Sequence, residues 1–93
     1  MKYSILFTNQ FMRSYKKCLK RGCDKALFEK VVTILSTTGT LPSCYHPHKL
    51  TGQWKGFWEC HIQPDWLLIY LIEDNVLTLT LVDTGTHADL FDM

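Results

Sequence analysis

The chain has 93 residues, of which 46% are hydrophobic and 20% charged, with a formal net charge of +1. This length holds one hydrophobic core, so residues 1–93 are predicted to form a single domain, which excludes a multidomain enzyme. No apolar run approaches the roughly 18–20 residues that cross a bilayer, and the N-terminal segment lacks a secretory cleavage site. A cytoplasmic location without membrane contact is therefore expected.

Charge and cysteine content divide the chain further. Residues 1–30 hold eight of the ten Lys and Arg residues, whereas residues 31–93 hold all four His and seven of the nine acidic residues. The four cysteines form no CxxC pair and match no zinc-finger spacing. Free thiols are therefore expected rather than a disulfide framework.

The first half of the chain predicts a strand and two helices. Residues 3–7 read as a short strand, and from Thr8 apolar residues recur at helical spacing until Gly22. A second helix is expected to begin at Asp24 and to end near residues 37–39. The short connection predicts that the two helices form an antiparallel hairpin.

The second half predicts a sheet. Residues 40–53 lack periodicity and read as a loop, and strands are expected at 54–62, 66–72 and 76–82. The uninterrupted apolar run of the second of these strands predicts a central strand covered on both faces. Residues 86–89, THAD, match a helix-capping pattern and predict a short C-terminal helical turn. The order β-α-α-β-β-β predicts an α+β fold, with a helical hairpin packed on a small, mainly antiparallel sheet.

Basic side chains follow one face of the first predicted helix. They lie at positions i, i+3, i+4 and i+7, and they are Arg13, Lys16, Lys17 and Lys20. Such a stripe is either a solvated helix face or a surface that binds the phosphates of a polyanion such as RNA.

The candidate catalytic groups lie in the second half of the chain. They are His46, His48, His61, Asp65 and His87. One chemistry that suits them is zinc binding through His46 and His48, together with one of the other three residues. The other is metal-free RNA cleavage, in which a base activates the 2′-OH, an acid protonates the leaving 5′-oxygen, and cations balance the charge on the phosphate. Histidines that titrate near neutral pH suit both proton transfers.

Three sequence blocks resemble a known family. The strings HKLTGQWKG (48–56), PDWLLIY (64–70) and TGTHADLF (84–91), together with His61, look like the YafQ branch of the RelE-type bacterial toxins. The resemblance implies a RelE-like fold. It also implies ribosome-dependent cleavage of mRNA in the A site, without a metal or other cofactor, through a 2′,3′-cyclic phosphate. A cognate antitoxin and the ribosome are the implied partners, and the toxin alone is expected to be a monomer.

The resemblance also implies roles for individual residues. His48, His61, Asp65 and His87 match the family's catalytic positions, with His87 as general acid, Asp65 or His48 as base, and His61 on the 2′-OH or the phosphate. Residues expected to contact substrate are Lys49, Lys55, Trp66 and Phe91. Alternation along the strand 54–62 predicts that Lys55 shares a face with His61.

One position departs from the family pattern. The residue before TGTH is Asp83, where the branch usually has an arginine. An aspartate there would repel the phosphate by about 1–4 kcal/mol, depending on the local dielectric. A weakened endonuclease, or one with a shifted codon preference, is therefore expected. The second alternative is a toxin of the same fold that acts by binding the ribosome or DNA gyrase. An unrelated RNA- or metal-binding domain is the third alternative.

Overall fold

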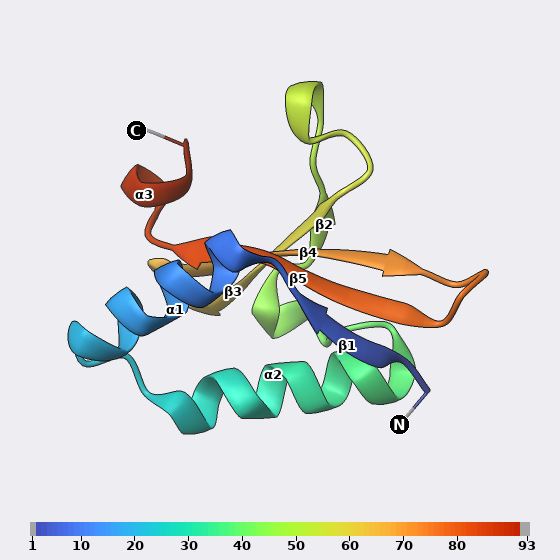
Figure 1. Ribbon diagram of the computed structural model, residues 1–93, viewed down its shortest axis with the longest axis horizontal. Coiled ribbons are helices and arrows are strands. Elements are labelled where there is room, and N and C mark those ends of the chain that lie inside the picture. The colour runs from blue at the N-terminus through green and yellow to red at the C-terminus, as the bar shows by residue number, and fades with distance from the viewer. Residues whose placement is uncertain (1, 92–93) are drawn as a thin grey trace.

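The order of elements follows the predicted pattern with one additional short strand (Figure 1). The computed structural model describes residues 2–91. The strands are β1 (Ser4–Phe7), β2 (His48–Lys49), β3 (Trp58–Gln63), β4 (Trp66–Glu73) and β5 (Thr78–Gly85), and the helices are α1 (Asn9–Lys20), α2 (Lys25–Thr38) and α3 (His87–Phe91). Two 3-10 turns, η1 (Ser43–Tyr45) and η2 (Gly52–Trp54), flank β2. Within residues 2–91, every helix is too short or too polar to cross a membrane.

The ends of the first two helices lie where the sequence predicts them. The Thr8 hydroxyl accepts a hydrogen bond from the Phe11 N–H (2.9 Å), and the Asp24 carboxylate accepts one from the Ala26 N–H (2.9 Å). Each bond satisfies a donor that the first helical turn leaves without a backbone partner. Helix α2 ends at Gly39, whose φ of 80° is a left-handed conformation that suits glycine.

The five strands form one mixed sheet in the order β1-β5-β4-β3-β2. Strand β1 pairs with β5 in parallel, and all other pairs are antiparallel. Strand β4 is central as predicted, and residues 66–70 are all buried because neighbouring strands and both faces of the sheet shield them. The prediction of an α+β fold with a mainly antiparallel sheet is confirmed.

The main core lies between the helices and one face of the sheet. Figure 1 shows α2 across this face and α3 on the opposite side. Phe28 of α2 stacks on Phe11 of α1 (ring centroids 5.7 Å apart), and both belong to the same buried cluster as Leu68 and Leu81 of the sheet. Burying side chains of this size stabilises the fold by roughly 1.5–3 kcal/mol each.

Three predicted boundaries are wrong. The region 40–53, predicted as a loop, contains β2, which pairs with β3 at the edge of the sheet. The strand predicted at 54–62 begins only at Trp58, because Trp54 lies in η2 and Gly56 has a φ of 96° that breaks an extended chain. The strand predicted at 76–82 lies at 78–85, since residues 74–77 form the turn that precedes it. All four cysteines are free thiols, as expected.

Candidate active site

A buried carboxylate lies between two of the predicted catalytic histidines. Pairing of β2 with β3 places His48 opposite Glu59, and His61 follows on the same face of β3. The Nε2 atoms of His48 and His61 lie 3.4 and 3.6 Å from the same Glu59 oxygen, Oε1. The Glu59 side chain is only 5% exposed, so two imidazoles share one carboxylate that water barely reaches.

The rings of these two histidines are held differently. His48 Nδ1 lies 3.0 Å from the main-chain carbonyl oxygen of His46, which can only accept, so Nδ1 carries the proton. The pKa of His61 is lowered mainly by burial, with the charges of His46, His87 and His48 adding to the effect, while Glu59 opposes it. His61 is therefore neutral near pH 7.

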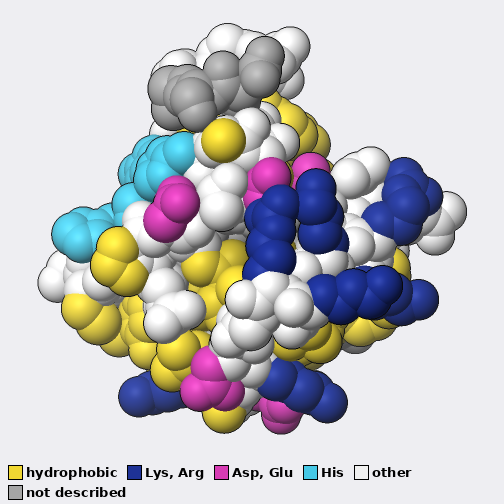
Figure 2. Space-filling view, turned by 90° about the vertical axis from the view of Figure 1, so that its left-hand side faces the viewer, with side chains coloured by type: hydrophobic (Ala, Val, Ile, Leu, Met, Phe, Trp, Pro, Cys, Tyr) yellow, Lys and Arg dark blue, Asp and Glu magenta, His cyan; other side chains and the backbone are white. Residues whose placement is uncertain are grey.

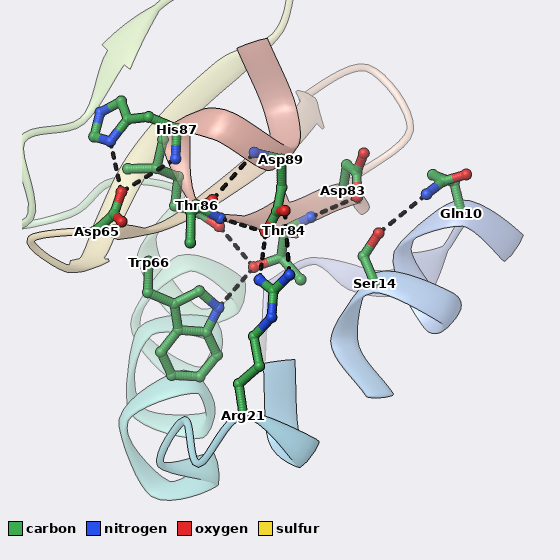
Figure 3. A network of polar contacts seen from close by, with 11 residues as sticks. Gln10, Ser14, Arg21, Asp65, Trp66, Asp83, Thr84, Thr86, His87 and Asp89 are labelled. Atoms are coloured by element: carbon green, nitrogen blue, oxygen red, sulfur yellow. Dashed lines mark hydrogen bonds and ion pairs between the residues drawn. The ribbon is translucent and has the colours of Figure 1, made fainter. Parts of the chain in front are cut away.

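Asp65 and His87 form a second pair. Asp65 lies in the turn between β3 and β4, and its Oδ1 accepts hydrogen bonds from the main-chain N–H of His87 (3.1 Å) and from Nδ1 of its ring (2.9 Å). These bonds lower the pKa of Asp65, the side-chain bond most. Because Nδ1 donates to the carboxylate, Nε2 of His87 is left for another proton transfer (Figure 3).

Ring contacts join the two pairs. The centroid of the His61 ring lies 5.4 Å from that of His46 and 5.7 Å from that of His87. We refer to His46, His48, His61 and His87 as the histidine cluster. In the view of Figure 2, histidine side chains gather at the left of the molecule. Within residues 2–91, no three His, Cys, Asp or Glu side chains are arranged to hold a metal ion.

Helix α3, which carries His87, is fixed by a reciprocal cap. The Thr86 N–H donates to Asp89 Oδ2 (3.0 Å), and the Asp89 N–H donates to Thr86 Oγ1 (3.1 Å). Arg21, at the end of α1, also holds Asp89 Oδ2 (2.6 Å), and this bond does most to lower the pKa of Asp89. A Cβ atom on Gly85 would lie 2.8 Å from Asp89 Cβ, so glycine is required there. The predicted C-terminal helical turn and its cap are confirmed.

Trp66 is a core residue. Its side chain is buried, its Nε1–H donates to Thr84 Oγ1 (2.9 Å), and the Thr84 hydroxyl donates to the Leu67 carbonyl (2.6 Å). This placement contradicts the expectation that Trp66 contacts substrate, because neither its ring nor its N–H is accessible. Phe91 is half-buried on α3, the helix that carries His87, so a contact with substrate remains a prediction.

The two lysines predicted to bind substrate are placed elsewhere. Lys49 pairs with Trp58 on the face opposite His48, and its Nζ lies 5.6 Å from the Trp58 ring centroid. Lys55 lies in the turn after η2 and outside β3, so the prediction that it shares a strand face with His61 is wrong. Neither lysine is therefore well placed to supply positive charge to the histidine cluster.

Asp83 is turned toward α1. Its Oδ1 accepts from the Thr84 N–H (2.8 Å), and it lines a small pocket of about 120 Å³ with Ser14 and Lys17 of α1. Figure 3 shows Asp83 on the side of α3 away from Asp65 and His87. The negative charge that distinguishes this chain from the family pattern thus lies next to a basic helix.

The basic stripe of α1 is exposed as a whole. Its members are Arg13, Lys16, Lys17 and Lys20. In the view of Figure 2, Lys and Arg side chains occupy the side opposite the histidines, with acidic side chains between the two groups. One face of the molecule therefore offers both a proton-transfer cluster and a cationic surface.

Glu59 was missed as a site residue by sequence reasoning. Alternation along the predicted strand already placed it on the face of His61. A lone acidic residue on a strand carries no signal by itself, and the two-residue strand that brings His48 to it has no detectable period. His46 was a candidate catalytic group without a role of its own in RNA cleavage, although its ring contacts that of His61.

Comparison with known proteins places the chain among toxins. Residues 3–92 match the family described as bacterial toxin of type II toxin–antitoxin system, YafQ. The mRNA interferase toxin YafQ of Escherichia coli K12 is 39% identical over 88 residues, which are 94% of each chain. The crystal structure of the E. coli DinJ-YafQ toxin–antitoxin complex superposes with a TM-score of 0.87 at 37% identity, covering 98% of this chain and 99% of that one. A metal-bound toxin from Helicobacter pylori superposes with a TM-score of 0.88 at 40% identity, covering 96% and 99%.

Proposed function

The chain belongs to the YafQ family of toxins of type II toxin–antitoxin systems, and we propose that it cuts mRNA in the A site of the ribosome without a metal. The observation that carries this proposal is the Asp65–His87 pair beside His61. In this pair, Nε2 of His87 is available to donate a proton. The ring of His61, which is neutral, lies in contact with that of His87.

His87 is the general acid of this mechanism. The Asp65 carboxylate accepts a hydrogen bond from Nδ1 over 2.9 Å and holds the ring in one orientation. This orientation leaves Nε2, the other ring nitrogen, to protonate the leaving 5′-oxygen.

The geometry favours His61 over Asp65 or His48 as the base. Asp65 already accepts two hydrogen bonds from His87, and Nδ1 of His48 is bound to a carbonyl. His61 is neutral, and Glu59 faces one of its ring nitrogens, so the other can take the proton of the 2′-OH. Attack of this oxygen on the phosphate and loss of the 5′-oxygen leave a 2′,3′-cyclic phosphate. His48, bound through Nδ1 to the His46 carbonyl and facing Glu59 through Nε2, helps to position that carboxylate beside His61.

Asp83 makes the enzyme weaker than its relatives. Without an arginine before TGTH, the phosphate lacks a cationic donor whose removal typically costs about 10²–10³ in rate. Because Asp83 and Lys17 line the same pocket at α1, a positive charge nearby reduces the repulsion between Asp83 and the phosphate. Asp83→Arg is expected to raise the cleavage rate at least tenfold, and an unchanged rate would show that the arginine position is not limiting here.

We further propose how the toxin is controlled and located. It is a single cytoplasmic domain over residues 1–93, a monomer when free, and it is held inactive in a hetero-oligomer by an antitoxin. The exposed stripe of α1, Arg13, Lys16, Lys17 and Lys20, binds the phosphate backbone of ribosomal RNA.

Asp83 also supports a second candidate function. A family member without the arginine could arrest growth by occupying the ribosome or DNA gyrase without cutting RNA. The retained Asp65–His87 pair favours the endonuclease, because a protein that only binds has no need of an oriented proton donor.

Induced expression in a bacterial host, with primer extension on a reporter mRNA, separates the two functions. The wild type is expected to arrest growth and to cut within codons, His87→Ala is expected to do neither, and Lys30→Ala, an exposed change on α2, serves as a matched control. Growth arrest by both the wild type and His87→Ala with intact mRNA would establish binding instead. Metal analysis of the purified protein tests the zinc alternative independently.

A further inference from the structure

A pocket of about 440 Å³ opens beside the histidine cluster. It is lined by residues 44–46 of the η1 turn and by residues 61–64 at the end of β3. Its volume falls within the roughly 300–1,000 Å³ of typical small-molecule sites. None of the catalytic steps assigned above uses it, although His61 forms part of its wall.

The lining of the pocket combines apolar walls with polar groups at its mouth. Ile62 is buried, and Tyr45 is half-buried against the main core, so both present fixed apolar surface. His46 and Gln63 are exposed and offer hydrogen-bonding groups. Flat apolar faces with polar edges are the features of an unpaired nucleobase, which proteins bind by stacking and by hydrogen bonds to its edges.

His46 joins this pocket to the catalytic groups. It adopts a φ of 50°, an uncommon left-handed conformation for a residue with a side chain, and its N–H donates to the Ser43 carbonyl (2.9 Å). Its own carbonyl accepts from His48, and its ring contacts that of His61. Strained backbone of this kind persists where surrounding contacts hold it, and here it fixes the pocket wall against two catalytic residues.

We propose that this pocket binds the base of a nucleotide next to the cleaved bond, and that His46 and Gln63 select which base is accepted. The inference rests on the proposed endonuclease function and adds to it a source of sequence preference. A phosphate at His61 and His87 places the neighbouring base at the His46 end of the row of three rings.

The binding step is tested on the isolated protein by NMR titration with the four nucleoside 5′-monophosphates. We expect one of them to shift the signals of residues 44–46 and 61–64 more than the other three do. His46→Asn, which suits the left-handed backbone, and Gln63→Ala should each weaken this binding about three- to tenfold, the loss expected for one hydrogen bond. Ser43→Ala, in the same turn but outside the pocket lining, is the matched control. Shifts confined to the basic face of α1 would overturn the proposal.

The selection step is tested by mapping cuts in ribosome-bound mRNA with randomised codons. The wild type should prefer one base beside the cut, and Gln63→Ala should flatten that preference while its melting temperature stays unchanged. If Gln63→Ala and His46→Asn both keep the base preference of the wild type, selection by this pocket is refuted and the endonuclease function stands. Selective nucleotide binding in the pocket, with no cleavage by the wild type, would support the pocket and refute the endonuclease instead. Protection of residues 44–46 and 61–64 by an antitoxin peptide but by no nucleotide would assign the pocket to that partner and overturn the proposal.

Discussion

Replacing Asp89 tests how α3 is held in place. In Asp89→Ala the protein loses the hydrogen bond from the Thr86 N–H and both bonds from the Arg21 guanidinium, at 2.6 and 3.3 Å. Loss of a helix cap costs about 0.5–2 kcal/mol, and loss of an exposed ion pair about 0–1 kcal/mol. The free energy of unfolding should therefore fall by about 0.5–3 kcal/mol. The melting temperature should fall by roughly 4–8 °C for each kcal/mol.

Urea unfolding followed by tryptophan fluorescence at pH 7 measures this change. Asp89→Asn keeps an oxygen that can accept from Thr86 but loses the charge, so it should cost no more than about 1 kcal/mol. Arg21→Ala should have a similar effect, and the double variant with Asp89→Asn should lose little more than either single variant. Lys30→Ala is the control. Fully additive losses would refute the view that Arg21 acts through Asp89.

The effect of Asp89 on stability also depends on pH. Its pKa is lowered well below the ordinary value, mainly by the hydrogen bond from Arg21 and then by that from Thr86. A lowered carboxyl pKa stabilises the folded state above the unfolded pKa of about 4, and this stabilisation is lost as the pH falls through the folded pKa. The difference between wild type and Asp89→Asn should thus narrow below about pH 4. A difference that grows on acidification would contradict the assignment.

Three further changes probe the site and the core. Glu59→Gln should lower the pKa of His61 further, because no carboxylate then opposes the effect of burial. NMR titration of the His61 ring measures this pKa, and a higher pKa in the variant would contradict this account. Trp66→Phe should cost about 1–3 kcal/mol in urea unfolding, because it removes the bond to Thr84 and leaves space in the core, whereas a loss below about 0.3 kcal/mol would argue against that bond. Burial raises the pKa of the Cys60 thiol to about 12, so Cys60 should resist a thiol reagent at pH 8 until the chain is unfolded, and fast labelling of the folded protein would disprove its burial.

Local signals in the sequence were sufficient for the helices and the central strand. Thr8 and Asp24 cap helices where their side chains can reach the first free N–H groups, and the apolar run of β4 is buried on both faces. These features depend on residues close together in the chain. A reader of the sequence can therefore find them without knowing the fold.

The lysines and Glu59 show where such reasoning fails. Which face a strand residue occupies depends on the strand boundary and on its pairing, and a shift of one residue reverses the face. Lys49 lies opposite His48 only because both belong to β2, a strand too short to have a period. Glu59 gains its place between two histidines from the same pairing, which no local pattern encodes.

The parallel pairing of β1 with β5 has a consequence for folding during synthesis of the chain. Residues 4–7 are synthesised before their partners, residues 78–81, and cannot pair with them until the intervening chain has been made. The pairing closes a loop of about 74 residues, a separation that slows folding. Since α3 with His87 follows β5 directly, the Asp65–His87 pair can form only after β5 has been synthesised.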